Sequence, residues 1–364
     1  MHVLYDHQIF EAQAVGGISR YFSELIPAVA ATGTTSVSVF MGLHRNRYGL
    51  ADRRQAFTRF FGVPCPGPPS TRGATRWLNQ RLFRLFAARV RADIHHATYY
   101  ATIPTGRQER RVITVHDMIH ETLPQYFRAG DDTTATKLTA VDRAHHIIAV
   151  SHSTKSALLR ILRVPERKVS VVYHGSALTH HVPPRPRVAA PYLLFVGERR
   201  GYKNFGALLR AYARSPRLRR DLLLVCFGGT PFTRDEQAAF ASLGVADRIV
   251  RLTGDDRRLA GYYRHAAAFV QPSLAEGFGL SILEAQHYGC PVVCSRVDAL
   301  AEVAGGAAAY FDPADPDDIM ARLETVLFDG VEADRLRTLG YQRERQFSWQ
   351  RCAEETRAVY ASIL

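Results

Sequence analysis

Two glutamates, Glu276 and Glu284, have the spacing that says most about chemistry in this sequence. Seven residues separate them, an apolar segment at Ala268–Val270 precedes the first, and glycines follow it. This pattern predicts a strand, a loop and then a helix that begins near Phe278. The start of a helix offers unpaired N–H groups and partial positive charge, which suit phosphate or a dense set of hydroxyls. We therefore expect Glu276 on the loop and Glu284 about two turns into the helix, holding opposite ends of one ligand.

The simpler alternative is that both glutamates are solvated and that Gly277 and Gly279 only form a turn. For an isolated Glu–Gly pair that interpretation would be preferred. Here the predicted helix is otherwise apolar, as at Leu280 and Ile282, and a further strand follows at Pro291–Cys294. A helix packed between buried strands leaves few solvated positions. We interpret the segment as a binding site in which the glycines let the backbone approach a ligand closely.

The same segment resembles the Glu-x7-Glu motif of the retaining family 4 glycosyltransferases, in which a Gly-x-Pro-Val-Val strand follows. Glu276 and Glu284 match the two glutamates, and Gly289–Val293 matches the strand. The resemblance implies an α/β chain of GT-B fold, with two Rossmann-like doubly wound domains that face each other across a cleft. It also implies transfer of a hexose from a nucleoside-diphosphate sugar with retained anomeric configuration.

Two segments of the first half of the chain fit this resemblance. Gly16 and Gly17 match the family's Gly-Gly loop before the first helix, where a glycine pair allows close approach of a diphosphate or an acceptor. His116 follows a predicted strand at Val112–Val115, where open α/β sheets place functional groups. A lone histidine there is more often structural, but its match to a family histidine beside the transferred sugar favours a role in the site.

A basic segment at the start of the second half resembles the family's phosphate-binding segment. Arginine offers a planar fork for phosphate oxygens, and Lys203 a compact charge. Glu198 stands where many relatives have arginine, so either Arg199 or Arg200 takes that role. The resemblance assigns catalytic roles to His116, Arg199, Lys203 and Glu276, and donor contacts to Gly16, Gly17, Arg200, Gly228, Gly277, Phe278, Gly279, Leu280 and Glu284.

Short apolar segments alternate with helical patterns along the chain, which predicts parallel sheets covered on both faces. After a first strand within Met1–His7, these segments are Val37–Phe40, Ile94–Ala97, Val112–Val115, His146–Val150, Val169–Tyr173, Tyr192–Gly197, Leu222–Phe227, Ile249–Leu252, Ala268–Val270 and Pro291–Cys294. A Pro/Arg stretch at Val182–Arg187 interrupts them and predicts a linker. We expect an acceptor-binding domain at 1–182, a donor-binding domain at 183–346, and a C-terminal helix at 347–364 that the resemblance places against the first domain.

Composition agrees with a two-domain globular enzyme. The chain has 364 residues, of which 46% are hydrophobic, and it lacks an apolar run of the roughly 20 residues that a bilayer crossing needs. The N-terminus does not have the pattern of a signal peptide. The five cysteines are scattered, without the spacing of a metal site, so we expect reduced thiols and a cytoplasmic location.

The net charge of +13 favours an anionic partner. Fourteen arginines and only three acidic residues lie between Gly42 and Arg111. From Thr71 to Val90 the arginines interleave with aromatic and aliphatic residues, as in a helix that lies on an anionic membrane, where each basic residue contributes about 1 kcal/mol. The alternative is an ordinary helix with a solvated basic face. The anionic partners to consider are a phosphorylated substrate, an anionic membrane and nucleic acid. Nucleic acid ranks last of the three, because no zinc-finger, RNP or helix-turn-helix pattern occurs.

The glycine loop and the Arg-Arg-Gly-Tyr-Lys-Asn segment look like those of bacterial mannosyltransferases of surface-polysaccharide assembly. That resemblance implies GDP-mannose as donor, a lipid-linked oligosaccharide as acceptor in exopolysaccharide or O-antigen synthesis, and a peripheral location on the cytoplasmic face of the inner membrane. It also implies a metal-independent reaction, in which the leaving phosphate takes the acceptor proton. The alternatives are other donors (UDP-glucose, UDP-GlcNAc, GDP-fucose or GDP-rhamnose), a nucleotide-sugar epimerase of similar architecture, and a catalytically silent nucleotide-sugar-binding subunit.

Overall fold

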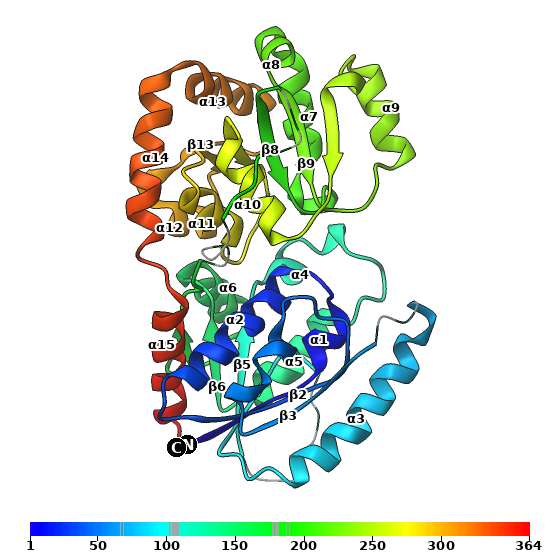
Figure 1. Cartoon of the computed structure of the whole chain (residues 1–364), viewed down its shortest axis with the longest axis vertical. Coiled ribbons are helices and arrows are strands. Elements are labelled where there is room, and N and C mark those ends of the chain that lie inside the picture. The colour runs from blue at the N-terminus through cyan, green and yellow to red at the C-terminus, as the bar shows by residue number, and fades with distance from the viewer. Residues whose placement is uncertain are drawn as a thin grey trace. The chain divides into compact units, whose positions relative to one another are not determined.

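The computed structural model describes residues 1–65, 67, 69–101, 103, 109–176, 178, 182–186, 188 and 190–364. The chain divides into unit 1, made of Met1–Gly175 and Ser348–Leu364, and unit 2, made of Ser176–Phe347 (Figure 1). Two residues that carried sequence-based predictions lie outside the described residues, Arg107 of the arginine-rich stretch and Arg187 of the predicted linker.

Unit 1 is built on a parallel sheet. In its described residues the sheet has seven strands in the order β3-β2-β1-β4-β5-β6-β7. The strands are β1 His2–Tyr5, β2 Ser36–His44, β3 Arg59–Pro64, β4 Ile94–Ala97, β5 Arg110–Val115, β6 His146–Ala149 and β7 Val169–Val171. The strand order reverses beside β1, and in open α/β sheets such a switch point is where the carboxyl ends of the strands bind ligands.

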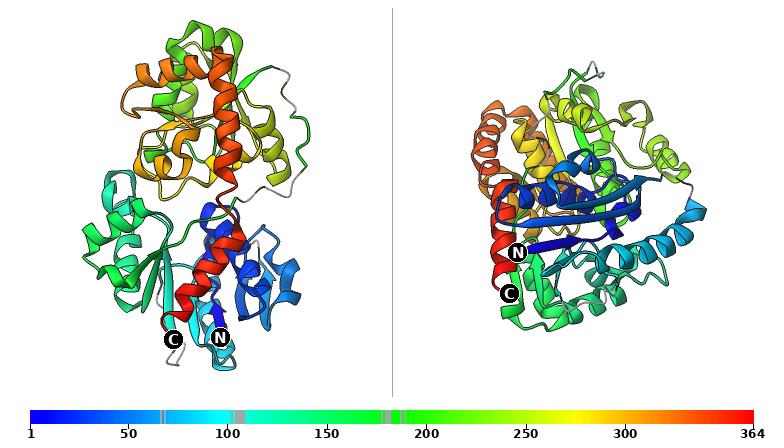
Figure 2. Two further views of the ribbon diagram at one scale, coloured as in Figure 1. Left: turned by 90° about the vertical axis from the view of Figure 1, so that its left-hand side faces the viewer. Right: turned by 60° about the horizontal axis from the view of Figure 1, so that its bottom comes forward.

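Helices cover both faces of this sheet (Figure 1). They are α1 Gln8–Ala12, α2 Gly17–Ala31, α3 Arg72–Ala88, α4 Ile119–Thr122, α5 Thr133–Arg143, α6 His152–Leu162 and α15 Trp349–Ala361. The last of these returns to unit 1 from the far end of the sequence and packs beside α2 (Figure 2). The hydroxyl of Tyr360 on α15 lies 2.8 Å from that of Tyr5 on β1 and 2.6 Å from Nδ1 of His96 on β4. Gly175 and Trp349, where the chain leaves and re-enters unit 1, touch so closely that Gly175 has no room for a Cβ.

Unit 2 repeats the architecture. Over its described part the sheet has six parallel strands in the order β10-β9-β8-β11-β12-β13. The strands are β8 Tyr192–Val196, β9 Leu223–Phe227, β10 Ile249–Leu252, β11 Ala268–Gln271, β12 Val292–Ser295 and β13 Ala309–Phe311. The helices are α7 Phe205–Arg214, α8 Pro216–Asp221, α9 Arg234–Ser242, α10 Asp256–His265, α11 Leu280–His287, α12 Asp298–Ala304, α13 Pro316–Phe328 and α14 Gly330–Glu344.

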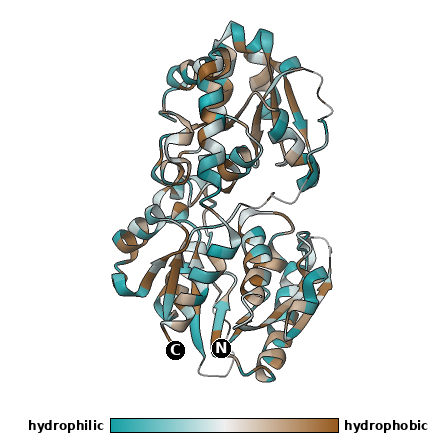
Figure 3. Ribbon diagram, turned by 60° about the vertical axis from the view of Figure 1, so that its left-hand side comes forward, coloured by the Kyte–Doolittle hydropathy of each residue, from teal (hydrophilic) through white to brown (hydrophobic). Residues whose placement is uncertain are grey.

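Central strands are buried on both faces in each unit, as parallel sheets require. Val3 and Leu4 of β1 and Leu193 and Leu194 of β8 are each at most 2% exposed. In Figure 3 several strands are hydrophobic throughout, while the surrounding helices carry hydrophilic turns. The prediction of an α/β chain with two Rossmann-like doubly wound domains is confirmed.

Among the described residues, no helix combines the length and the apolar character that crossing a bilayer demands.

Candidate active site

The centre of the candidate site in unit 2 is an ion pair between Lys203 and Glu276. Lys203 follows β8 and Glu276 follows β11, and these two strands are parallel neighbours, so their carboxyl ends meet at one edge of the sheet. Lys203 Nζ lies 2.7 Å from Glu276 Oε1. The amide of Leu274 also donates to the carbonyl of Tyr202 at 2.8 Å, which ties the two loops together. The sheet topology therefore joins two residues that are far apart in the sequence.

Glu276 is held by more than this cation. Gln271 Nε2 and Ser273 Oγ donate to Glu276 Oε1 at 2.8 and 2.6 Å. Burial by itself raises the pKa of Glu276, but attraction and hydrogen bonding from Lys203, with the bonds from Ser273 and Gln271, outweigh it and lower the pKa. Glu276 is thus a fixed anion at neutral pH, able to accept hydrogen bonds from hydroxyl groups.

Helix α11 begins at Leu280, two residues after the predicted start near Phe278. Gly279 precedes it with φ of 108°, a left-handed conformation that favours glycine, and a Cβ there would meet Leu300 at 2.8 Å. On the helix, the buried Glu284 accepts a hydrogen bond from the hydroxyl of Tyr263 at 3.1 Å. As predicted, Glu276 lies on the loop and Glu284 on the helix, but Glu284 is about one turn into α11 and not two, because the helix begins later than expected.

The two candidate arginines differ in environment. Arg199 is 6% exposed, and its Nε lies 2.7 Å from Glu236 Oε1. Its Nη2 donates to the carbonyl of Thr230 at 2.7 Å, and its guanidinium lies 4.7 Å from the ring centroid of Phe232. Arg199 thereby ties the loop after β8 to the loop after β9. Arg200 is exposed. Which of the two contacts a diphosphate stays a prediction.

The loop after β9 carries Gly228, with φ of 84°, and Gly229, with φ of 61°. A Cβ on Gly229 would lie 2.7 Å from the carbonyl oxygen of Gly197, so this loop and the loop after β8 approach as closely as backbones allow. Gly228, Lys203, Glu276 and Glu284 all belong to loops or helices that follow strands of unit 2. They lie at the carboxyl edge of the sheet, which is where open α/β sheets bind ligands.

His116 lies in unit 1, directly after β5. Its ring contacts Tyr21 with centroids 5.0 Å apart, and His174 lies 6.0 Å away. Burial, with smaller contributions from His174, His96 and Lys137, lowers the pKa of His116 well below its usual value, so the ring is neutral at pH 7. Within the described residues, His116 Nε2 has no hydrogen-bond partner.

The Gly16–Gly17 pair opens α2 as predicted. The amide of Gly16 donates to the hydroxyl of Tyr48 at 2.9 Å, and its carbonyl accepts from the amide of Arg20 at 2.9 Å. Gly17 has open space at the position of a Cβ, whereas a side chain on Gly16 would collide with Gln13. The pair lies in unit 1 with His116, whereas the other predicted site residues lie in unit 2.

Sequence reasoning missed several partners of the predicted residues. Tyr263, which binds Glu284, and Glu236, which binds Arg199, had no signal of their own. Ser273 had a weak one, because it lies only three residues before Glu276 and its hydroxyl reaches that carboxylate within the same loop. The described residues contain no cluster of three or more His, Cys, Asp or Glu side chains arranged to hold a metal.

Two known family models match the two halves of the sequence. The family model described as Glycosyltransferase Family 4 matches residues 15–180, and the model described as Glycosyl transferases group 1 matches residues 190–329. The O-antigen chain mannosyltransferase B of Escherichia coli is 32% identical over 272 residues, which are 70% of this chain and 71% of that protein. The chain belongs to glycosyltransferase family 4. This membership confirms the resemblance seen in the sequence and makes the chain a hexosyltransferase, not an epimerase.

Other known proteins resemble this chain in sequence or in fold. The D-inositol 3-phosphate glycosyltransferase 2 of Catenulispora acidiphila is 31% identical over 309 residues, 74% of this chain and 70% of that protein. Among solved structures, the sucrose-phosphate synthase of Thermosynechococcus elongatus has a TM-score of 0.79 at 20% identity, covering 100% of this chain and 98% of that one. Anabaena HepE with UDP and glucose has a TM-score of 0.75 at 16% identity, with 99% of each chain covered. At these identities the structures show the fold alone.

Proposed function

We propose that this glycosyltransferase transfers mannose from GDP-mannose to a lipid-linked oligosaccharide, with retained anomeric configuration, in O-antigen or exopolysaccharide synthesis. The observation that carries the proposal is the Lys203–Glu276 pair at one sheet edge of unit 2, followed along the chain by α11 with Glu284. The choice of mannose is supported by relatives named as O-antigen chain mannosyltransferases, from Escherichia coli at 32% identity and from Salmonella typhimurium at 28%.

In this proposal unit 2 holds the donor. Lys203 and the N–H groups at the start of α11 face the diphosphate and stabilise the charge that develops as it leaves. Glu276 accepts hydrogen bonds from hydroxyls of the sugar, and Glu284 from those of the ribose. Arg200, which is exposed, is better placed than Arg199 to reach the diphosphate, because the Arg199 guanidinium is engaged by Glu236 and Thr230.

Unit 1 supplies His116 and the acceptor. Because His116 is neutral, its ring can orient the sugar without repelling the positive charge that develops at the anomeric carbon. A leaving-phosphate oxygen accepts the proton of the acceptor hydroxyl as the new glycosidic bond forms. Lys203 supplies positive charge that a divalent metal would otherwise give, so we propose a metal-independent transfer.

A thermal-shift panel of nucleotide sugars tests the donor. We expect GDP-mannose at 100 times its Kd to stabilise the chain by about 2.7 kcal/mol. If UDP-glucose, UDP-GlcNAc, GDP-fucose or GDP-rhamnose stabilises the chain and GDP-mannose does not, the assignment of GDP-mannose as donor is wrong. NMR of the first product should show the α-anomer, like the donor, and a β-product would contradict retention.

We further propose that α3 places unit 1 on an anionic membrane surface. Trp77 and Leu85 are 59% and 60% exposed on this helix, while Phe83 is fully buried against the sheet. Arg81 lies over the ring of Trp77, with 5.3 Å from guanidinium carbon to ring centroid. Exposed apolar residues beside arginines are typical of a helix that lies at an interface between lipid and water.

Vesicle sedimentation tests this surface. Replacing Trp77 and Leu85 by serine should weaken binding to phosphatidylglycerol-containing vesicles at least tenfold, because burying each side chain in lipid is worth about 1.5–3 kcal/mol. The matched control is Val331→Ser on α14 of unit 2, where the valine is 80% exposed. Equal loss in the control, or equal binding of the wild type to neutral phosphatidylcholine vesicles, would refute the membrane surface.

A further inference from the structure

A pocket in unit 1 has no role in the mechanism above. Its volume is about 110 Å³, and it lies between α1, the residues after β2 and the first turn of α3. The residues that line it include Glu11, Leu43, Arg45, Arg72, Thr75 and Arg76. Because α1 follows β1 and Arg45 follows β2, and these strands are parallel neighbours, the pocket lies at the carboxyl edge of the sheet. His116 follows β5 at the same edge.

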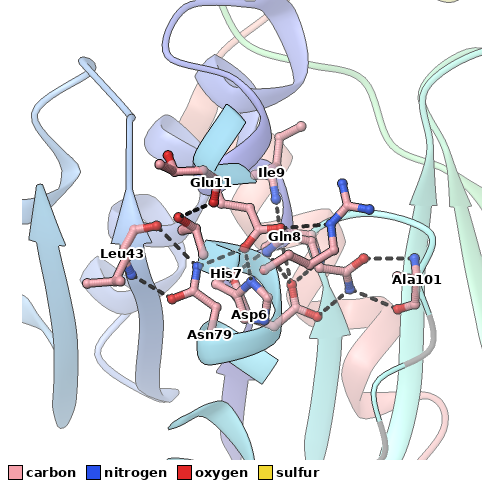
Figure 4. Close-up of polar contacts among 12 residues, drawn as sticks. Asp6, His7, Gln8, Ile9, Glu11, Leu43, Asn79 and Ala101 are labelled. Atoms are coloured by element: carbon pink, nitrogen blue, oxygen red, sulfur yellow. Dashed lines mark hydrogen bonds and ion pairs between the residues drawn. The ribbon is translucent and has the colours of Figure 1, made fainter. Parts of the chain in front are cut away.

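Among the described residues that line the pocket, one is acidic, and it is already engaged by protein groups. Glu11 Oε2 lies 3.1 Å from His7 Nδ1 and accepts a hydrogen bond from Asn79 Nδ2 at 2.7 Å, as Figure 4 shows. Its other oxygen accepts a bond from Arg76 Nε at 3.3 Å. Asn79 is fixed in turn, because its side chain accepts from the amide of Leu43 at 2.7 Å and donates to its carbonyl at 3.1 Å. Both oxygens of Glu11 are therefore bonded to protein groups, and this side chain has a structural role in the lining of the pocket.

The remaining charge in the pocket is positive. Arg45 donates to the carbonyl of Gly67, and Arg72 has no carboxylate partner in the described part of the chain. The first turn of α3 contains no acidic residue, so the positive end of a 17-residue helix adds to the guanidinium groups. Three arginines against one glutamate leave a surplus that suits a ligand carrying two negative charges. Arginine forks match phosphate oxygens.

The same helix continues from the pocket into the exposed apolar residues. Trp77 directly follows Arg76, and Leu85 lies two turns further along α3. A ligand that used both features would carry a doubly charged head and a long apolar chain. Free diphosphate or a soluble nucleotide would use only the pocket.

We propose that the Arg45–Arg72–Arg76 pocket binds the diphosphate of an isoprenoid diphosphate, and so holds the lipid end of the acceptor. This inference rests on the proposed function and names the contact through which unit 1 recognises its lipid-linked substrate. The diphosphate lies in the pocket, and the isoprenoid chain runs along Trp77 and Leu85 toward the membrane.

Calorimetric titration of the full chain with farnesyl diphosphate tests the pocket directly. GDP and UDP are present at saturation, so that a diphosphate site in unit 2 is blocked. Replacing Arg45 and Arg72 by glutamine should weaken binding at least tenfold, and Arg72→Gln alone, at an exposed position, at least threefold. The control replaces Arg89 and Arg91, which are exposed beyond the other end of α3, by glutamine and removes the same charge. Equal weakening by the control would refute the pocket.

Two further titrations distinguish the source of the diphosphate. Farnesol and inorganic diphosphate should each bind at least tenfold more weakly than farnesyl diphosphate. If inorganic diphosphate binds as well as farnesyl diphosphate, the isoprenoid assignment is wrong.

Failure of this inference can be separated from failure of the proposed function. If the chain transfers sugar but its pocket variants bind farnesyl diphosphate as well as the wild type does, the pocket assignment alone is refuted. Loss of binding in those variants, in a chain that transfers no sugar from any donor, refutes the proposed transfer and leaves the pocket standing.

Discussion

Replacing Lys203 by alanine should lower the turnover number about 10²- to 10³-fold, because removing one group that stabilises transition-state charge has that effect in other enzymes. Glu276→Ala should have a similar effect, since the carboxylate holds Lys203 and, in the proposed function, also the sugar. Steady-state kinetics with donor and acceptor saturating give the measurement. Unit 2 should stay folded, because both side chains lie at the edge of the sheet and outside its core.

A second ion pair of unit 2 offers a matched control. Arg214 Nη1 lies 2.7 Å from Asp317 Oδ1, the same separation as in the Lys203–Glu276 pair, but both side chains are more than half exposed. Arg214→Ala should leave turnover unchanged. In the double variant Lys203→Ala, Glu276→Ala the losses should not add, because the two residues act as one unit. Turnover of the Lys203 variant within twofold of the wild type would overturn its assigned role.

Acidification should destabilise unit 1 through three buried histidines. Burial lowers the pKa of His96 and of His174 to about 3, and it lowers that of His116 well below 6.5. The unfolded chain takes up protons below pH 6.5 that the folded chain does not. The free energy of unfolding therefore has its full contribution from these histidines above pH 6.5, and it falls as the pH drops toward 3. At pH 5 the loss is about 2 kcal/mol for each of His96 and His174, or about 4 kcal/mol for the two, and His116 adds to it in the same direction.

Urea unfolding followed by tryptophan fluorescence measures this effect in unit 1 alone, because Trp77 and Trp349 are the two tryptophans of the chain and both lie there. His174→Phe removes one group that takes up a proton on unfolding. It should reduce the slope of the unfolding free energy against pH by about 1.4 kcal/mol per pH unit. His265→Phe, at an exposed position in unit 2, is the control and should not change it. A wild-type curve that is flat from pH 7 to 5 would show that these rings are accessible to protons.

Much of the fold followed from the sequence because parallel strands are short and apolar throughout. The strands that were missed differ from that pattern. Arg59–Pro64 forms the edge strand β3, contains a glycine and ends in proline, and is only partly buried. Ala309–Phe311 forms β13 and has just three residues, too few to show a pattern. Edge strands need less apolar surface, so their sequences carry less information.

The candidate site divides in the same way between local and distant information. The positions of Glu276 and Glu284 followed from glycines and apolar residues beside them in the sequence. The difference between Arg199 and Arg200 did not, since it depends on Glu236, which reaches Arg199 only through the packing of two loops. Likewise, the neutral state of His116 depends on burial near His96, His174 and Tyr21, which come together from a strand, a loop and a helix.

The return of α15 has a consequence for how the protein is made. Unit 2 interrupts unit 1 between Gly175 and Ser348, so the hydroxyl of Tyr360 cannot meet Tyr5 and His96 until the whole of unit 2 has been synthesised. Unit 2 is a contiguous stretch and can complete its folding during translation, ahead of the part that was synthesised first. A prematurely terminated product would thus contain a finished second unit and an unfinished first one, with the hydrophobic surface beneath α15 open to proteases and chaperones.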